Sequence, residues 1–458
     1  MKRLLLLGGC LIIIVTSIYV GTHWIFSRPS HRVHASDSSG DWPMYLYGQA
    51  RTGANLNETA ITTANAMNLR LGWKFATTGV VGASPTLVNG IMYIGSWNGF
   101  EYAVDVATHQ QRWATYLGIS QQSKRCYGGY GIGVDSTAAV QDNVVYVGGG
   151  DGYMYALNAA NGTVLWKTLL GNPPYYNWSS PLLYNDTLYI GLAAYCDPPF
   201  AQGKIMALRM SDGSIVASVS LVPGKQTGAP VWGSVSVDAS TNTLYAATGN
   251  NGSQRLGKQP NAEAIVALDA TTLVVKDRWQ IPKSQQVVDS DFGTTPTLFE
   301  INGVSYVGAL NKNGIYYVLN RNNLAAGPVW EHALSGSSEN VQGDNISPSC
   351  YNNGTIYAGS AGGAINGQSY GGSVNAFDAT TDTTLWSFYT AGAMVSPVTC
   401  TADLVVDNQG KTVEVRNAFS GAVLFSYKTN ARLFGASLIS NGALYVPSSN
   451  GTVYAFTV

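Results

Sequence analysis

The chain has 458 residues, of which only 11% are charged, and its 25 Lys and Arg against 26 Asp and Glu give a net charge of −1. This balance excludes a nucleic-acid-binding protein that relies on a broad basic surface. The hydrophobic fraction of 45% also excludes an acidic disordered chain. The 52 Gly and 27 Tyr residues indicate many short strands joined by tight turns.

The N-terminal 26 residues have the pattern of a targeting segment. Met1, Lys2 and Arg3 precede an apolar run over residues 4–20 that continues loosely to residue 26. A short basic head before an apolar run is typical of a secretory signal peptide or of an uncleaved membrane anchor, and both remain open. We therefore expect an extracytoplasmic protein, secreted or membrane-anchored, with a polar linker at 27–40 and the folded domain at 41–458.

From residue 41 onward the sequence repeats itself. An element built on Tyr-x-Gly and a later Trp recurs, and its anchor position falls at Tyr93, Tyr146, Tyr189, Tyr245, Tyr306, Tyr357, Val405 and Tyr445. Apolar-alternating runs separated by Asn-Gly or Asp-Gly turns predict a four-stranded antiparallel sheet in each unit. Eight units predict an all-β, eight-bladed β-propeller, with an open solenoid or two sandwiches as alternatives. The last unit lacks a Trp strand, and we expect residues 69–75 to complete it and close the ring.

The opening of the folded domain and the repeat resemble a known family. Residues 41–45 (Asp-Trp-Pro-Met-Tyr), the turn from Arg51 to Asn55, and Trp73 are similar to that family's opening segment. The blades resemble the pyrroloquinoline-quinone (PQQ) repeat of quinoprotein alcohol dehydrogenases, most of all the polyvinyl-alcohol-dehydrogenase-like branch. Proteins with this repeat include dehydrogenases and a non-catalytic scaffold lipoprotein of outer-membrane assembly. The resemblance therefore indicates the fold, and function depends on the site.

Three stretches resemble the family's functional site. Trp232 matches a Trp that stacks on the quinone, and Asn250 matches an Asn that ligates Ca²⁺ through its amide oxygen, as a flat cofactor and a hard cation require. Asp291, with Asp289 in reserve, resembles the general base that takes the substrate's hydroxyl proton near the metal. Lys312 resembles a basic residue that reaches the cofactor's oxygens. From the residues alone, these positions are equally a packing aromatic, turn residues and a solvated lysine.

Two departures from the family concern cysteine and carboxylate positions. The larger enzymes carry adjacent cysteines over the quinone, whereas this chain has only Cys126 in that segment. Their second calcium carboxylate is a Glu, and the substitute here, Asp197, is one position out of register. Cys126 and Cys196 lie in equivalent loops of neighbouring units, so we predict a disulfide between them. Cys350 and Cys400 follow Ser-Pro in neighbouring units and either pair or are simply buried.

Two functions follow from this pattern. The first is PQQ- and Ca²⁺-dependent oxidation of a small or polymeric alcohol, with electrons passed to an external acceptor because no covalent haem motif is present. The second is a non-catalytic propeller that binds a protein partner as an extracytoplasmic scaffold. Convergence of Trp232, Asn250, Asp291 and Lys312 on one funnel at the ring axis would favour the enzyme, and their scatter would favour the scaffold.

Overall fold

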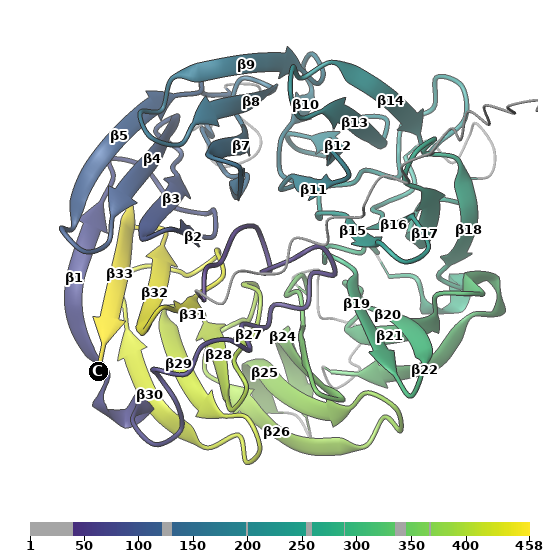
Figure 1. Cartoon of the computed structure of the whole chain (residues 1–458). Helices are drawn as coiled ribbons and strands as arrows, with labels where there is room; N and C mark the ends of the chain where they lie inside the picture. Colours follow the sequence, from purple (N-terminus) through teal and green to yellow (C-terminus); the bar gives the residue numbers. More distant parts are fainter. Residues whose placement is uncertain are drawn as a thin grey trace, which may run out of the picture. The chain divides into compact units, whose positions relative to one another are not determined.

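Eight antiparallel sheets are arranged as blades around a ring (Figure 1). The computed structural model describes residues 40–120, 131–197, 200–252, 259–287, 289–334, 345–365 and 368–458. The blades belong to one compact unit, Ser38–Val458. This arrangement confirms the predicted all-β, eight-bladed propeller.

The predicted targeting segment at 1–26 and the linker up to residue 39 lie outside the described residues. Among the residues that are described, no helix has the length and apolar character needed to cross a membrane. Signal peptide and membrane anchor therefore both stay predictions.

Seven blades use strands that follow one another in the chain. Blade 1 contains β2 (Thr86–Val88), β3 (Ile91–Gly95), β4 (Phe100–Asp105) and β5 (Gln110–Tyr116). Blade 2 contains β6 (Ala139–Gln141), β7 (Val144–Gly148), β8 (Tyr153–Asn158) and β9 (Val164–Leu169). Blade 3 contains β10 (Tyr175–Tyr176), β11 (Leu182–Tyr184), β12 (Thr187–Ala194), β13 (Lys204–Arg209) and β14 (Ile215–Ser220). Blade 4 contains β15 (Ser236–Asp238), β16 (Thr243–Ala247), β17 (Ala264–Asp269) and β18 (Val275–Gln280).

The remaining blades follow the same plan. Blade 5 contains β19 (Thr297–Ile301), β20 (Val304–Leu310), β21 (Ile315–Asn320) and β22 (Pro328–Ala333). Blade 6 contains β23 (Cys350–Asn352), β24 (Thr355–Ile365), β25 (Gln368–Asp378) and β26 (Thr384–Thr390). Blade 7 contains β27 (Thr399–Cys400), β28 (Leu404–Gln409), β29 (Thr412–Asn417) and β30 (Val423–Lys428). Blade 8 contains β31 (Leu438–Ser440), β32 (Ala443–Ser448), β33 (Thr452–Thr457) and β1 (Arg70–Ala76). Short 3₁₀ turns are η1 (Ala66–Asn68), η4 (Lys283–Gln285) and η5 (Leu324–Ala326).

The first strand of the chain closes the ring. β1 pairs antiparallel with β33, with Trp73 opposite Ala455, and so supplies the outer strand that the last repeat lacks. This confirms the predicted closure by residues 69–75. Blade 3 departs from the four-stranded prediction, because β10 adds a fifth strand against β12.

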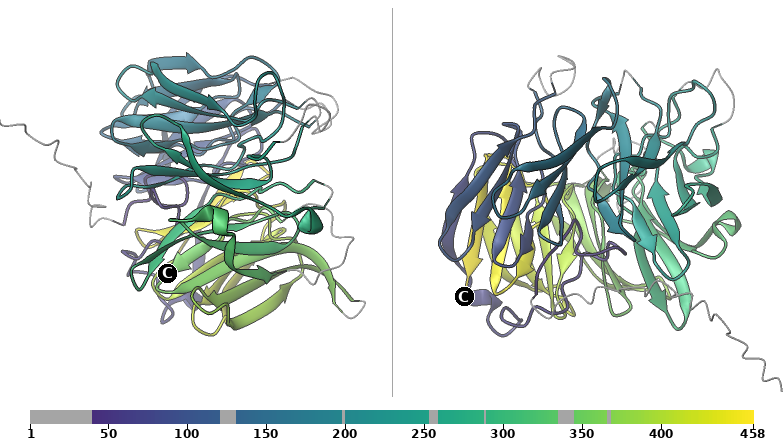
Figure 2. Two further views of the ribbon diagram at one scale, coloured as in Figure 1. Left: turned by 90° about the vertical axis from the view of Figure 1, so that its right-hand side faces the viewer. Right: turned by 45° about the horizontal axis from the view of Figure 1, so that its top comes forward.

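The recurring Tyr and Trp residues join each blade to the next. In blade 1 the rings of Tyr93 and Trp113 lie 5.9 Å apart, and the indole N–H of Trp113 donates to the Ala159 carbonyl of blade 2 at 2.8 Å. Equivalent bonds run from Trp166 to Met210, from Trp330 to Ala379 and from Trp386 to Ala418. The repeat therefore encodes contacts between sheets that pack face to face, as Figure 2 shows.

Hydroxyl groups fix the segments that enter the innermost strands of six consecutive blades, from blade 8 to blade 5, and we call this row the hydroxyl ring. Backbone N–H groups of one blade donate to a Ser or Thr hydroxyl of the next at 2.8–3.0 Å: Ser84 to Thr137, Thr137 to Ser180, Ser180 to Ser234, Ser234 to Thr295, and Ala436 to Ser84. Because the same bond recurs, it shows which residues of different blades occupy equivalent positions. Two residues before the hydroxyl position, blade 2 has Asp135 and blade 4 has Trp232.

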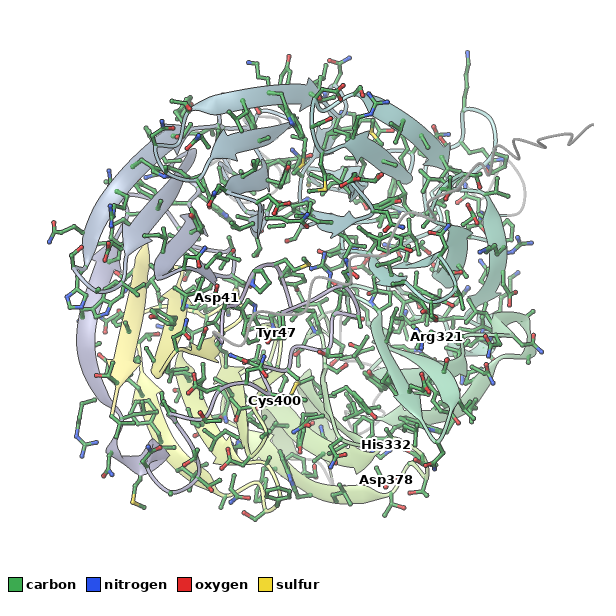
Figure 3. All side chains as sticks on the ribbon, viewed as in Figure 1. Asp41, Tyr47, Arg321, His332, Asp378 and Cys400 are labelled. Carbon is green, nitrogen blue, oxygen red and sulfur yellow. A yellow bond between two sulfur atoms is a disulfide. The ribbon has the colours of Figure 1, made fainter. Side chains whose placement is uncertain are left out.

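Residues 42–55 run across the inside of the ring and bind the innermost strand of every blade (Figure 1). The bonds join Trp42 to Leu87, Pro43 to Val140, Gln49 to Leu183 and Val237, Ala50 to Leu298, Thr52 to Tyr351, Gly53 and Asn55 to Cys400, and Asn55 to Ile439. Tyr47 accordingly lies inside the ring, as does Cys400 (Figure 3). We call this stretch the axial segment; it ties all eight blades together from within.

Candidate functional site

Three candidate side chains meet where the chain enters blade 5. Asp289 and Asp291 precede β19, and Lys312 lies in the turn between β20 and β21. The ammonium of Lys312 donates to Asp289 and to Asp291, each at 2.8 Å. The backbone N–H of Lys312 also donates to the Asp291 carbonyl oxygen at 2.9 Å, which holds the turn against the entering segment. The structure thus brings two candidates from separate motifs into direct contact.

Asn250 joins this cluster from blade 4, just after β16. Its backbone N–H donates to Asp291 Oδ1, and its side-chain amide donates to Asp289 Oδ1 at 2.6 Å. Gly249 makes the approach possible, because a Cβ at that position would lie 2.5 Å from Asp291 Oδ1. Asp289 therefore bonds both to the Asn and to Lys312, although the sequence pattern favoured Asp291 over it.

Trp232 forms the aromatic side of the cluster. It is half-buried at the inner edge of blade 4, and the Lys312 ammonium lies 5.3 Å from its ring centroid. Gly293 leaves room for the indole, since a Cβ there would lie 2.5 Å from Trp232 Cη2. Indole, ammonium and carboxylates therefore lie side by side, and Trp232 as a residue is only partly buried. We call Trp232, Asn250, Asp289, Asp291 and Lys312 the axial cluster.

Burial disfavours the charged forms of Asp289, Asp291 and Lys312. Burial raises the pKa of Asp291, and the nearby Lys312 offsets this rise only in part. Burial acts on Asp289 as well, but hydrogen bonds from Lys312 and Asn250 outweigh it and lower the pKa of this carboxyl. Burial of Lys312 is likewise outweighed by the two carboxylates, which raise the pKa of its ammonium. The result is an ionised Asp289–Lys312 pair beside an Asp291 that binds a proton more readily than a free Asp.

Asp197 lies near the axial cluster but outside it. It follows β12 in blade 3 and keeps an exposed surface. Partial burial, and then the Asp291 and Asp289 carboxylates, raise the pKa of Asp197 to about 6, while Lys312 acts in the opposite direction. Asp197 therefore stands at the exposed edge of the cluster that the other candidates form.

The donor set suits a hard cation and a flat anionic ligand. Across the described residues, no group of three or more His, Cys, Asp or Glu side chains is placed to hold a metal ion. The carboxylates of Asp289 and Asp291 and the amide oxygen of Asn250 are nevertheless oxygen donors, the type that Ca²⁺ prefers. The indole of Trp232 and the adjacent Lys312 are the side-chain types that a planar quinone with negative oxygens would contact. The residue types are therefore those that Ca²⁺ and PQQ require, while Lys312 bonds to both carboxylates in this structure.

The sequence suggests two disulfide pairings for the cysteines of the folded domain, and the structure describes both partners of only one of them. Cys350 and Cys400 form a disulfide between blades 6 and 7, with their Cα atoms 6.1 Å apart, which confirms one of the two expectations for them. Cys196 is disulfide-bonded. Its predicted partner, Cys126, lies outside the described residues, so that pairing stays a prediction.

One buried carboxyl, Asp135, escaped the sequence analysis. Asp135 holds in blade 2 the position that Trp232 holds in blade 4, and it accepts a hydrogen bond from the Trp97 indole at 2.7 Å. Gly82 leaves space for it, because a Cβ there would lie 2.2 Å from Asp135 Oδ1. Burial raises the pKa of Asp135 to about 6, against the bond from Trp97. Only the hydroxyl ring, which sets the blades in register, identifies this position.

Fold and site together define a class: an eight-bladed propeller of PQQ-type repeats, with carboxylates, a lysine and a tryptophan clustered where blades 4 and 5 meet. A family model described as outer membrane protein assembly factor BamB, built on the PQQ repeat, matches residues 49–292 and 370–458. The chain belongs to this PQQ-repeat family.

Two curated relatives are dehydrogenases that share less than 30% of their residues with this chain. The chain is 28% identical over 333 residues to the quinohemoprotein alcohol dehydrogenase of Comamonas testosteroni, a match covering 62% of this chain and 45% of that enzyme. It is 22% identical over 378 residues to the polyvinylalcohol dehydrogenase of Sphingopyxis sp. (strain 113P3), covering 72% of this chain and 56% of that enzyme. The chain thus spans about half the length of these relatives.

Solved structures show the same fold. The Comamonas testosteroni enzyme superposes with a TM-score of 0.76 at 20% identity, over 91% of this chain and 80% of that one. BamB from Moraxella catarrhalis superposes with a TM-score of 0.57 at 15% identity, over 85% of this chain and 98% of that one. Both a dehydrogenase and an assembly factor therefore share the architecture.

Proposed function

We propose that the chain is a quinoprotein alcohol dehydrogenase-like enzyme that binds PQQ and Ca²⁺ at the axial cluster and passes electrons from an alcohol to an external acceptor. The observation that carries the proposal is the convergence of Trp232, Asn250, Asp291 and Lys312, which come from three separate motifs, on one cluster. The similarity to alcohol dehydrogenases over 62% and 72% of the chain supports the same activity.

Each residue of the axial cluster has a distinct task in this proposal. Asn250 and Asp291 would hold Ca²⁺ through oxygen atoms, with Asp197 at the edge as a further carboxylate. Trp232 would carry the flat face of PQQ, and Lys312 would bond to its oxygens. When bound, the quinone supplies a two-electron acceptor for the carbon–hydrogen bond of the alcohol.

Asp291 is suited to take the hydroxyl proton of the alcohol. A general base must bind a proton in the transition state, and burial has already raised the pKa of this carboxyl. Asp289 and Lys312 hold it in place, because the ammonium bonds to both carboxylates at 2.8 Å.

An extracytoplasmic location belongs to the same proposal. The Cys350–Cys400 disulfide joins neighbouring blades. Structural disulfides persist in oxidising compartments and are rare in the cytosol. Secretion or membrane anchoring through residues 1–26 would deliver the chain to such a compartment.

A second candidate function is a non-catalytic scaffold that binds a protein partner. The observation in its favour is that Lys312 already satisfies both carboxylates, as an ion-pair network with a purely structural role would. In that case the axial cluster stabilises the entry to blade 5 and binds no cofactor.

Dye reduction separates the two functions. The purified chain is reconstituted with PQQ and Ca²⁺, freed of excess cofactor, and assayed with an artificial electron acceptor and a panel of alcohols. We expect turnover with at least one alcohol and a loss of about 10²- to 10⁴-fold in Asp291→Asn. The control is Asp212→Asn, which removes an exposed carboxylate paired with Arg209 on blade 3. Absence of turnover with every alcohol in a folded, cofactor-loaded protein would contradict the proposed dehydrogenase function.

A further inference from the structure

A pocket opens on the end of the ring that carries the axial cluster, two blades further round. It lies at the turn between β28 and β29 of blade 7, which corresponds to the turn that places Lys312 in blade 5. The segments that leave blades 6 and 7 form its other walls. The pocket has a volume of about 340 Å³, the size of a small organic ligand.

Three cations from three different segments line this pocket. Lys411 lies in the β28–β29 turn, Lys428 ends β30, and Arg432 lies in the connection to blade 8. No Asp or Glu is among the lining residues. Over the ranges that the structure describes, none of the three forms an ion pair, although the chain as a whole balances 25 basic against 26 acidic residues.

The two carboxylates on the strands of blade 7, Asp407 and Glu414, are already paired with an arginine. Arg416 bonds to Asp407 at 2.6 Å and also to Glu414. Gln409, which lines the pocket, turns its amide N–H groups toward the same carboxylates, at 2.8 Å from Asp407 and 2.6 Å from Glu414. The acidic groups nearest in sequence therefore do not compensate the pocket's cations.

Bare backbone forms the pocket wall between the cations. A Cβ on Gly392 would lie 2.8 Å from the Gln409 carbonyl oxygen and 2.9 Å from the Gly410 nitrogen, so a side chain there would fill the contact. Gly410, with φ of 61°, donates to the Ala393 carbonyl at 3.0 Å and accepts from the Leu433 N–H at 2.8 Å. These bonds fix the three segments together, and the pocket is therefore held by the fold.

We propose that this pocket binds the oxyanion group of a small molecule, a phosphate or a carboxylate, through Lys411, Lys428 and Arg432. Like charges gathered around one concave surface focus a positive potential, which a bound anion relieves. Lys and Arg donors to an oxyanion form charge-assisted hydrogen bonds, and the guanidinium of Arg432 adds a planar pair of donors. The proposal is independent of PQQ binding, because none of these residues belongs to the axial cluster.

Isothermal titration calorimetry tests the pocket directly. The full chain is titrated at low ionic strength with inorganic phosphate and, separately, with succinate. We expect saturable binding of at least one of them, at one site per chain. Lys411→Gln and Arg432→Gln are each expected to weaken it about tenfold, the effect of losing one charge-assisted hydrogen bond.

A matched charge change elsewhere is the control. Lys167→Gln removes the same charge from β9 of blade 2, where the ammonium lies 4.8 Å from the Tyr153 ring centroid, and binding should stay unchanged. Arg432→Lys should retain more affinity than Arg432→Gln. A preference for phosphate or for succinate identifies the headgroup, and either supports the pocket. Absence of saturable binding of both, or equal loss in Lys167→Gln and Lys411→Gln, would overturn the proposal.

Discussion

The ammonium of Lys312 lies 2.8 Å from the carboxylate of Asp291, and the two side chains are only 11% and 7% exposed. The carboxylate of Asp289 lies at the same distance, 2.8 Å, from this ammonium. A buried ion pair contributes little net stability, because desolvation offsets the attraction, but removal of one partner leaves an uncompensated charge. The net stabilisation from this buried pair is therefore small, whereas the loss of either partner is costly.

Replacement of the ammonium should be costly. In Lys312→Met the Asp289 and Asp291 carboxylates lose their counter-charge, and we expect the free energy of unfolding to fall by about 3 kcal/mol. Urea denaturation measures this change, with Lys167→Met as the control. The double variant Lys312→Met with Asp291→Asn should recover part of the loss. A Lys312→Met protein as stable as the control would contradict the buried-pair description.

Trp232 should determine how tightly a flat ligand binds. Trp232→Leu removes the aromatic face, and we expect PQQ to bind about tenfold more weakly, the order of magnitude of one aromatic stacking contact. Trp232→Phe keeps a face and should lose less. Quenching of the remaining tryptophan fluorescence by PQQ gives the affinities, and equal affinity in all three proteins would rule out stacking on Trp232.

Asp135 should make stability depend on pH. Its pKa is raised by burial from 3.8 to about 6, so between these values the folded protein binds a proton that the unfolded chain releases. The contribution of Asp135 to the free energy of unfolding is therefore fully present below about pH 4, and it is lost as the pH rises through about 6. Urea midpoints of wild type and Asp135→Asn should converge at low pH, with the variant more stable above pH 6.

Trp97 offers a second readout of the same titration. Its indole N–H donates to Asp135 at 2.7 Å, so its fluorescence should change with a midpoint near pH 6. The change should be absent in Asp135→Asn. A midpoint near the ordinary Asp value would show that the carboxyl is well solvated.

Arg51 should anchor the axial segment. It is fully buried and donates to the carbonyl oxygens of Tyr45, of Pro181 at 3.0 Å and of Val235 at 3.1 Å. Arg51→Leu leaves these oxygens without a donor, and we expect a loss of about 3 kcal/mol or more in unfolding free energy. Arg278→Leu, an exposed change of equal charge on β18, is the control for urea denaturation. Equal stabilities would show that the axial segment does not need this guanidinium.

The sequence predicts those parts of the structure that repeat or that lie in short motifs. The Tyr–Trp spacing predicts the blades because it encodes contacts between neighbouring sheets, and the missing last strand predicts closure by β1. Motif matches also selected Trp232, Asn250, Asp291 and Lys312, although pattern alone could not show that they meet.

The remaining features depend on contacts between distant parts of the chain. Arg51 bonds to Pro181 and Val235, 130 and 184 positions away, and no local pattern encodes such a course through the ring. Asp289 has a left-handed φ of 62°, a conformation that the motif does not specify, and this turn directs it to both Asn250 and Lys312. The equivalence of Asp135 to Trp232 is recognised only from the hydroxyl ring, which shows which residues of different blades correspond. Long-range packing, which composition and spacing do not determine, places all three.

Equilibrium binding of PQQ to the purified, cofactor-free chain tests the central claim most directly. Titration with and without Ca²⁺, followed by tryptophan quenching and by the retained quinone absorbance, gives the stoichiometry. We predict one PQQ per chain, with Ca²⁺ strengthening the binding and Asn250→Ala abolishing the Ca²⁺ effect. A folded chain that retains no PQQ at saturating quinone and Ca²⁺ would contradict the account and leave the axial cluster as a structural ion-pair network.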